Sequence, residues 1–307
     1  MAENRNAQQV REITDKLEQG LKELFESERF KEYLKTMSKF YNYSFNNTLL
    51  IAMQKPDATL IAGYTAWQRN FDRHVMKGEK GIKILAPAPY KVQEEREKLD
   101  PATQKPVLDK DGKPVTETVE VTRPAFKVVS VFDVSQTDGK ELPDIAVDEL
   151  TGSVENYAAF FDALKELSPV PIAFENITDG AKGYFSHVEN RIAIQEGMSE
   201  IQTIKTAIHE IAHAKLHAVT PGEKVAPEDK KDRRTKEVEA ESVAYTVCQR
   251  YGIETSDYSF GYIAGWSSDK ETKELKGSLE TIRKTAAEMI TGIDEKLKER
   301  LAVKEQE

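Results

Sequence analysis

The chain contains only one cysteine, Cys248, and only five histidines among its 307 residues. A single thiol cannot form an internal disulfide, which agrees with a reducing compartment. No apolar run approaches the roughly 18–20 residues needed to span a bilayer. The polar start of the sequence shows no signal peptide. The sequence therefore predicts a cytoplasmic protein that does not associate with membranes.

The composition predicts a soluble chain whose charge is unevenly distributed. Charged residues make up 32% of it and hydrophobic residues 39%, and its length predicts two domains. Residues 1–140 hold 23 Lys and Arg against 21 Asp and Glu, whereas the remaining 167 residues hold 21 and 32. The first part can therefore meet a polyanion. Mimicry of DNA by the acidic second part is disfavoured, because its cations are mixed with its acids.

Three of the five histidines fall within nine residues, in a His-Glu-x-x-His pattern followed by His217. On an α-helix, His209 and His213 lie one turn apart on one face, where both imidazoles can bind one Zn²⁺ at about 2.0–2.1 Å. Glu210 is rotated away from that face but can take a proton from water. The pattern is typical of a metal-activated hydrolase, with Glu210 as the predicted catalytic base.

A third ligand is expected from a second helix, which the sequence places at about residues 235–248. Glu237 and Glu241 lie one turn apart on it. We predict that Glu237 binds the metal and that Glu241 accepts a hydrogen bond from a ligating histidine, although the order could be reversed. His217 could replace Glu237, but three ligands from one straight helix surround an ion poorly. A role beside the ligands or on the surface is therefore favoured for His217.

Residues 60–91 combine cations with aromatic side chains, as single-stranded nucleic acid requires. The candidate DNA-binding residues in this segment are Tyr64, Trp67, Arg69, Arg73, Lys77, Lys80 and Lys83. Trp67 and Phe71 are also one helical turn apart, and the residues alone favour a buried position for these two rings.

Periodicity and turn signals predict a mixture of helices and strands. In the first half, residues 5–40 are helix-prone, a short helix precedes Pro56, a helix follows Gly63, and strands cover 82–87 and 126–134. Residues 92–124 are polar and predict a protruding arm or hairpin between those two strands, partly disordered. In the second half we expect a helix ending at Pro169, a hairpin with strands at 183–187 and 191–195, the two motif helices, and a helix over about 270–303.

The pairing of His-Glu-x-x-His with the later Glu-x-x-Ala-Glu at 237–241 resembles zincin metallopeptidases whose third ligand is glutamate. The run from Glu239 to Ser267 resembles the ArdC-type antirestriction proteins of mobile genetic elements, in particular the LtrC-like branch. In the first half the resemblance is carried by three motifs: Asn46-Asn47-x-Leu49-Leu50, Gly63-Tyr64-x-x-Trp67 and Lys77-Gly78-Glu79-Lys80-Gly81.

The resemblance implies an α+β protein of two domains. A mixed α/β single-stranded-DNA-binding module would occupy residues 1–145, and a zincin-like metallopeptidase domain residues 146–307. In zincins an edge strand ahead of the motif helix pairs with an extended peptide, so the strand at 191–195 is the expected substrate strand. For the first domain as a whole, the resemblance shifts the preference toward DNA binding.

Two functions are compatible with these features. The first is a mobile-element protein that binds single-stranded DNA and carries a zinc-dependent peptidase, with a protein or peptide substrate and a role in antirestriction or protection of incoming DNA. The alternative is a non-catalytic DNA-binding protein whose zinc site is structural.

Overall fold

The computed structural model describes residues 2–101, 103–142, 154–178, 180–218, 231–253, 255–258 and 260–304. The predicted domain boundary near residue 145 and most of the charged loop after the first motif helix lie outside these ranges. Within them, none of the helices combines the length and apolar character that a membrane span requires.

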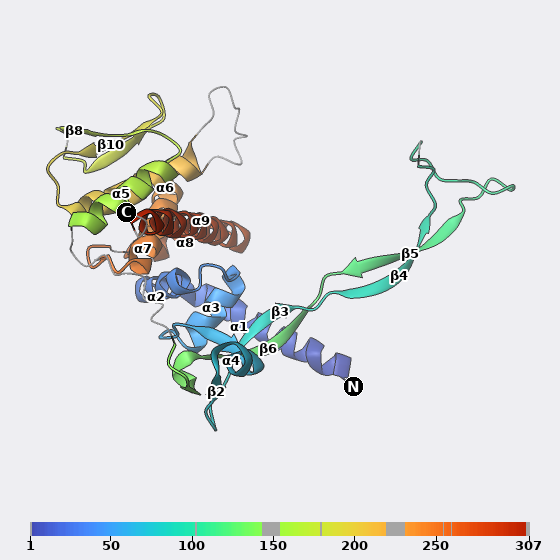
Figure 1. Cartoon of the computed structure of the whole chain (residues 1–307). Helices are drawn as coiled ribbons and strands as arrows, with labels where there is room; N and C mark the ends of the chain where they lie inside the picture. The colour runs from blue at the N-terminus through green and yellow to red at the C-terminus, as the bar shows by residue number, and fades with distance from the viewer. Residues whose placement is uncertain are drawn as a thin grey trace.

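The described N-terminal half contains four α-helices, α1 to α4, and a small antiparallel sheet (Figure 1). The sheet has the order β1-β6-β3, with both pairs antiparallel. Ile82, Ile84 and Val131 are on its buried face and form a small core with Phe40 and Ile51. The elements are α1 (Ala2–Leu24), α2 (Ser27–Lys39), α3 (Phe45–Gln54), β1 (Ile61–Gly63), α4 (Tyr64–Phe71), β2 (Arg73–Val75), β3 (Ile82–Pro87), β6 (Phe126–Asp133) and β7 (Thr137–Gly139).

Two side-chain amides of α3 form hydrogen bonds with the backbone groups along the edge of β3 that no strand covers among the described residues. Asn47 donates to the carbonyl of Leu85 and accepts from its N–H, both at 2.9 Å. Gln54 makes the same pair of bonds with Lys83, also at 2.9 Å. These side chains replace a neighbouring strand, so β3 is not left as an open edge. The Asn46-Asn47 motif therefore has a structural role at Asn47.

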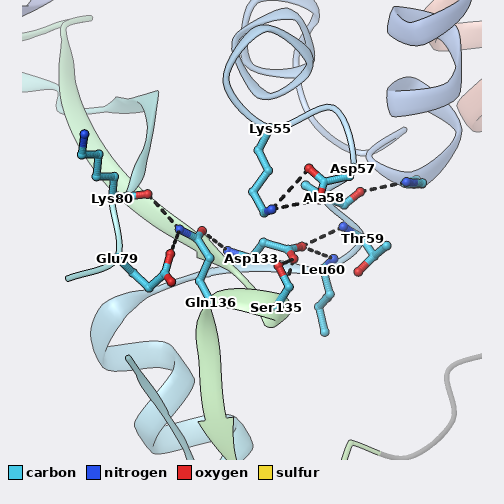
Figure 2. Close-up of polar contacts among 11 residues, drawn as sticks. Lys55, Asp57, Ala58, Thr59, Leu60, Glu79, Lys80, Asp133, Ser135 and Gln136 are labelled. Atoms are coloured by element: carbon cyan, nitrogen blue, oxygen red, sulfur yellow. Dashed lines mark hydrogen bonds and ion pairs between the residues drawn. The ribbon is translucent and has the colours of Figure 1, made fainter. Parts of the chain in front are cut away.

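A buried carboxylate, Asp133, organises the end of this sheet (Figure 2). It accepts the backbone N–H groups of Thr59 at 2.7 Å and Leu60 at 3.1 Å, and the hydroxyl of Ser135 at 2.6 Å. Burial acts to raise the pKa of Asp133, but these hydrogen bonds lower it below its ordinary value. Asp133 also donates its N–H to Gln136 at 2.9 Å.

Gln136 extends this network to the cationic turn at residues 77–81. Its amide donates to a carboxylate oxygen of Glu79 at 2.8 Å and to the carbonyl of Lys80 at 2.9 Å. The turn that presents Lys77 and Lys80 is therefore fixed to the end of β6.

The predicted arm is a two-stranded ribbon that projects away from the rest of the molecule (Figure 1). It consists of β4 (Tyr90–Glu97) and β5 (Thr116–Arg123), paired antiparallel, and it interrupts the chain between β3 and β6. The segment predicted as partly disordered, residues 92–124, thus contains the whole of β5 and residues 92–97 of β4, all of them paired.

The C-terminal half places helices beside a second small sheet. In that sheet β10 is central, parallel to β8 and antiparallel to β9. Helix α6 packs against β9, β10 and α7, and the long α9 packs against α5 and α7. The elements are α5 (Val154–Leu167), β8 (Ile172–Glu175), β9 (Gly183–Ser186), β10 (Arg191–Gln195), α6 (Glu200–His217), α7 (Arg233–Arg250), α8 (Ile263–Ser267) and α9 (Thr272–Lys304).

One hydrophobic core crosses the predicted domain boundary. The Phe30 ring of α2 lies 5.2 Å from the ring of Phe260, and Phe25 lies 5.8 Å from Trp266. Helices α1 to α3 therefore contribute to the core that supports α7, whereas β1, β3 and β6 have a separate small core. The division at 1–145 and 146–307 stays a prediction.

Candidate metal centre

Helix α6 holds the histidine motif rigidly. Ser199 caps the helix by accepting the N–H of Gln202 at 3.3 Å, and Glu200 in the first turn suits the positive end of the helix dipole. Its apolar face is fully buried, at Ala207, Ile208, Ile211 and Ala212. The histidines consequently emerge on the side that faces α7.

Three predicted ligands meet between α6 and α7. The Nε2 atoms of His209 and His213 are 3.1 Å apart, and Oε2 of Glu237 lies 3.8 Å from the first and 3.4 Å from the second. These donor atoms are the group in the described chain that could hold a metal ion. Ligands at about 2.0–2.1 Å from a tetrahedral ion are about 3.4 Å apart, so this donor set fits a divalent cation.

The imidazole of His209 is neutral and ready to bind a cation at physiological pH. Burial, with a smaller contribution from the neighbouring His213, lowers the pKa of His209 to about 4, and Glu237 opposes the shift. Metal binding requires neutral imidazole, so no proton has to leave this ring at pH 7.

A chain of hydrogen bonds behind His213 fixes the tautomer of this ligand. Nδ1 of His213 lies 3.1 Å from Nδ1 of His217, whose Nε2 lies 3.1 Å from Oε2 of Glu239. If Nε2 of His213 faces the metal, its Nδ1 carries the proton and donates to His217. His217 then donates from Nε2 to Glu239, which also accepts from Lys231 at 2.7 Å.

Glu239 is the residue that sequence reasoning missed. Its side chain is fully buried. Burial acts to raise its pKa, but the hydrogen bonds from His217 and Lys231 lower it. A signal was available in the sequence, because Glu239 stands between two apolar residues, Val238 and Ala240, which the structure buries. A carboxylate among buried neighbours requires a partner.

Replacing Glu239 by glutamine is expected to lower the affinity for Zn²⁺ by about 10–100-fold, because the amide no longer fixes the proton on His217 and the orientation of His213. Competition with a chromophoric chelator measures this affinity. Glu295→Gln, an exposed change on α9, removes the same charge and serves as the control. Equal affinities in the two variants would show that Glu239 does not support the ligands.

Glu210 lies where α6 meets β9. Burial raises the pKa of Glu210 to about 7 and Glu237 adds to the rise, whereas His213 and the N–H of Phe185, which Glu210 accepts, lower it. A Cβ on Gly183 would lie 2.6 Å from a methyl of Thr206, so only glycine lets β9 approach α6 this closely. A base with a pKa near 7 is suited to proton transfer at neutral pH.

Zn²⁺ binding at pH 6 is expected to release about 0.9 proton more from the wild-type chain than from Glu210→Gln. With its pKa at about 7, Glu210 is largely protonated at pH 6 in the metal-free protein, and a nearby cation favours the charged form. Calorimetry in buffers of different ionisation enthalpy measures the release. At pH 8 the difference should fall to about 0.1 proton, since Glu210 is already largely ionised. Equal release from the two chains at pH 6 would contradict the assignment.

Two expectations about the surroundings of the site are corrected. Glu241 does not accept a hydrogen bond from a ligating histidine; it accepts from the hydroxyl of Tyr262. The strand at 191–195 is not an edge, because β10 lies between β8 and β9. It is β9 that lies at the sheet edge and lines the cavity of about 520 Å³ in front of His209, Glu210 and His213.

Two of the predicted DNA-binding residues are structural. Trp67 is fully buried and donates its indole N–H to the carbonyl of Phe132 at 2.8 Å, so it cannot stack on a base. The guanidinium of Arg73 bonds Thr137 and the backbone of Lys140, which fastens β2 to β7. The buried position that the residues alone predicted for Trp67 is confirmed.

The other predicted DNA-binding residues are exposed: Tyr64, Arg69, Lys77, Lys80 and Lys83. The Tyr64 ring is 60% exposed and lies 6.1 Å from the ring of Phe132, an aromatic residue that sequence reasoning did not include. Lys83 pairs with Ser130 across β3 and β6, and Ser130 and Phe132 share one face by alternation. The rings of Tyr64 and Phe132 and the cation of Lys83 therefore lie on one side of the β1-β6-β3 sheet.

Two family models match the chain. Residues 4–132 match the N-terminal domain of anti-restriction factor ArdC, and residues 168–251 match the IrrE N-terminal-like domain, a model designated as peptidase M78. These matches confirm the predicted resemblance and the α+β fold class, in which a metallopeptidase-type fold follows the ArdC domain. Together with the donor set, the second match supports a divalent metal.

Similar proteins include an uncharacterised protein, pXO2-81, of Bacillus anthracis, which is 29% identical over 328 residues and is matched over 95% of this chain and 52% of its own length. DNA primase TraC of Escherichia coli is 34% identical over 148 residues, which are 45% of this chain and 12% of the primase. The chain thus spans about half the length, or less, of these curated relatives.

Two crystal structures of the antirestriction ArdC protein from the R388 plasmid also resemble the chain. The metal-free form is 22% identical with a TM-score of 0.47, covering 84% of each chain. The Mn(II)-bound form is 19% identical with a TM-score of 0.48, covering 81% of this chain and 82% of that one.

Proposed function

We propose that this chain, which joins an ArdC N-terminal domain to an IrrE N-terminal-like domain, is a single-stranded-DNA-binding protein with a zinc-dependent peptidase activity. Its role would be antirestriction, or protection of the incoming DNA of a mobile element. The name of the first domain's family and a relative that is a DNA primase support the nucleic-acid part.

The observation that carries the peptidase proposal is the position of Glu210 beside the three ligand atoms and at an open cavity. His209, His213 and Glu237 would hold Zn²⁺ and leave a further position for a water or a carbonyl oxygen. The cation would supply Lewis acidity and lower the pKa of that water. A purely structural site is normally closed by four protein ligands, so the open cavity favours catalysis.

Different residues of the chain would have different roles in peptide hydrolysis. Glu210 would take the proton of the attacking water and return it to the leaving amine. The edge of β9, which pairs with no further strand among the described residues, would align an extended peptide across the cavity by backbone hydrogen bonds. His217 and Glu239 would hold His213 in the tautomer that leaves Nε2 free to bind the cation.

A random-sequence peptide library tests this function, with cleavage read by mass spectrometry before and after chelation. Zinc-loaded protein is expected to cleave, and chelated protein is expected to stay folded by circular dichroism but to lose all cleavage. Unfolding on chelation without any cleavage to lose would favour the structural role of zinc. Neither result depends on the DNA-binding half.

The DNA-binding proposal is supported by Tyr64, Phe132 and Lys83 on one side of the β1-β6-β3 sheet. Exposed rings stack on bases with little sequence preference, and lysines contact phosphates. Lys77 and Lys80 lie on the turn that Gln136 fastens to the sheet through Glu79 and the carbonyl of Lys80. Fixed cations lose less conformational entropy when they bind a strand.

Replacing Lys77, Lys80 and Lys83 together by alanine is expected to weaken oligo(dT) binding and to reduce the slope of log affinity against log salt by about 2, since each phosphate contact on a single strand contributes about 0.7. Fluorescence anisotropy at several salt concentrations measures the slope. The matched control replaces three lysines of α9, at Lys273, Lys276 and Lys284. An unchanged slope in the first variant would remove these lysines from the DNA surface.

A further inference from the structure

A second cavity adjoins the metal centre on the far side of Glu210. Its volume is about 330 Å³, and it shares Gly183, His209 and Glu210 with the first cavity. The rest of its wall is formed by Lys182, Gln202, Lys205, Thr206, Glu241, Asp257 and Tyr258. A peptide that runs along β9 past Glu210 would therefore place one side chain beside each cavity.

We propose that the second cavity binds a lysine or arginine side chain of the polypeptide substrate, and that Glu241 selects it. This inference rests on the proposed peptidase function and specifies its substrate class. Glu241 would be a specificity-determining residue, because its carboxylate lines the cavity next to Glu210 without contacting the reacting atoms.

The cations that line the second cavity are already engaged. Lys205 is buried, forms an ion pair with Asp257, and lies 5.0 Å above the ring of Tyr258. Lys182 donates to the amide oxygen of Gln202 at 2.9 Å. Neither lysine forms an ion pair with Glu241 among the described residues. The carboxylate of Glu241 is therefore available to bind a cationic group of a ligand.

Among the described residues, the carboxylate of Glu241 has only an uncharged hydrogen-bond partner. It accepts a hydrogen bond from the hydroxyl of Tyr262, and the described residues give it no cationic neighbour within ion-pair distance. Burial raises the pKa of Glu241 to about 7, and the nearby Glu237 and Asp257 add to the rise. An ammonium or guanidinium group would supply the missing countercharge, and hydrogen bonds to a partly buried carboxylate are among the stronger ones.

The two cavities differ in charge: the first is lined by three cationic residues beside Glu210 and Glu237, and the second by two lysines beside three carboxylates. Its wall includes Lys231, Arg233 and Lys236, of which only Lys231 has a described carboxylate partner, in Glu239. A basic side chain would be repelled on that side and attracted on the side of Glu241. Discrimination then comes from both attraction and repulsion, which is how specific sites commonly work.

Shape supports the same ligand. Lysine and arginine carry a long aliphatic stem below the charge, and they need a cavity with apolar walls and a polar end. Tyr258 and Thr206 are among the residues that line the second cavity, and Glu241 provides the carboxylate.

Binding of octapeptides to the full-length Glu210→Gln chain, loaded with zinc, tests the proposal without turnover. A single arginine is moved through an Ala, Gly and Ser background, and each peptide is compared with its citrulline counterpart, which is uncharged and nearly isosteric. Fluorescence anisotropy gives the affinities. In at least one register, arginine is expected to bind about tenfold more tightly than citrulline.

The preference should fall to less than about twofold when Glu241→Gln is added, and should reverse toward glutamate-containing peptides with Glu241→Lys. Glu295→Gln removes the same charge from an exposed position on α9. This variant should keep the full preference for arginine over citrulline peptides. Equal binding of arginine and citrulline peptides, a preference that survives Glu241→Gln, or no peptide binding would overturn the proposal. If the unmodified chain binds these peptides with the expected preference but cleaves none, the peptidase proposal is contradicted and the assignment of the second cavity stands, because the binding assay needs no cleavage.

Discussion

Replacing Glu210 by glutamine is expected to slow peptide hydrolysis by about 10²–10⁴-fold while the chain still binds one metal ion. The glutamine has the size of glutamate but cannot accept the proton that water gives up. The metal ligands His209, His213 and Glu237 are untouched by this change, so the variant should still bind one zinc ion per chain at saturating Zn²⁺. Cleavage of the peptide library and metal analysis of the same sample separate the two effects.

The control for Glu210→Gln is Glu295→Gln, which removes a carboxylate from exposed α9. Its cleavage rate should equal that of the unmodified chain. Thermal unfolding of both variants shows whether any loss of activity follows from a loss of fold. Undiminished cleavage by Glu210→Gln would mean that another group takes the proton, and the role of Glu210 would have to be abandoned.

Replacing Glu237 by glutamine is expected to lower Zn²⁺ affinity by at least about 10²-fold, because a ligand is lost outright, whereas loss of a supporting residue costs about 10–100-fold. Glu241→Gln should change the affinity by less than about twofold. The two glutamates lie one turn apart on α7, but only Glu237 has a carboxylate oxygen near both histidines. Competition with a chromophoric chelator measures both affinities.

The opposite ranking would reverse the roles of the two glutamates. If Glu241→Gln lost the metal and Glu237→Gln kept it, the third ligand would come from the next turn of α7. The proposal for the second cavity would then fail as well, because Glu241 would be occupied by the cation rather than by a substrate side chain.

The histidine motif was predictable because its geometry is contained in one helix. The four-residue spacing of His209 and His213 fixes their common face, and Ile208 and Ile211 fix the buried side. The choice of Glu237 over Glu241 depends on how α6 and α7 cross. Sequence spacing limited the candidates for the third ligand to Glu237 and Glu241, which share one face of α7. The packing of α6 against α7 brings Glu237, and not Glu241, to the histidines.

The errors arose where a residue's role depends on distant parts of the chain. The pairing of β10 with β8 is parallel and joins strands separated by β9, so chain order placed the edge at the wrong strand. Arg73 was counted as a free cation because its partners on β7 lie more than 60 residues away. Glu239 was overlooked because its partner, His217, belongs to another helix.

The most direct test of the whole account is X-ray absorption spectroscopy of the zinc-loaded chain. We expect one zinc ion per chain with two imidazole nitrogens and oxygen donors at about 2.0–2.1 Å, and loss of the bound zinc in His209→Ala. A spectrum with sulfur or a single imidazole among the donors, or bound zinc that survives His209→Ala, would contradict the assignment of His209, His213 and Glu237 as the metal centre.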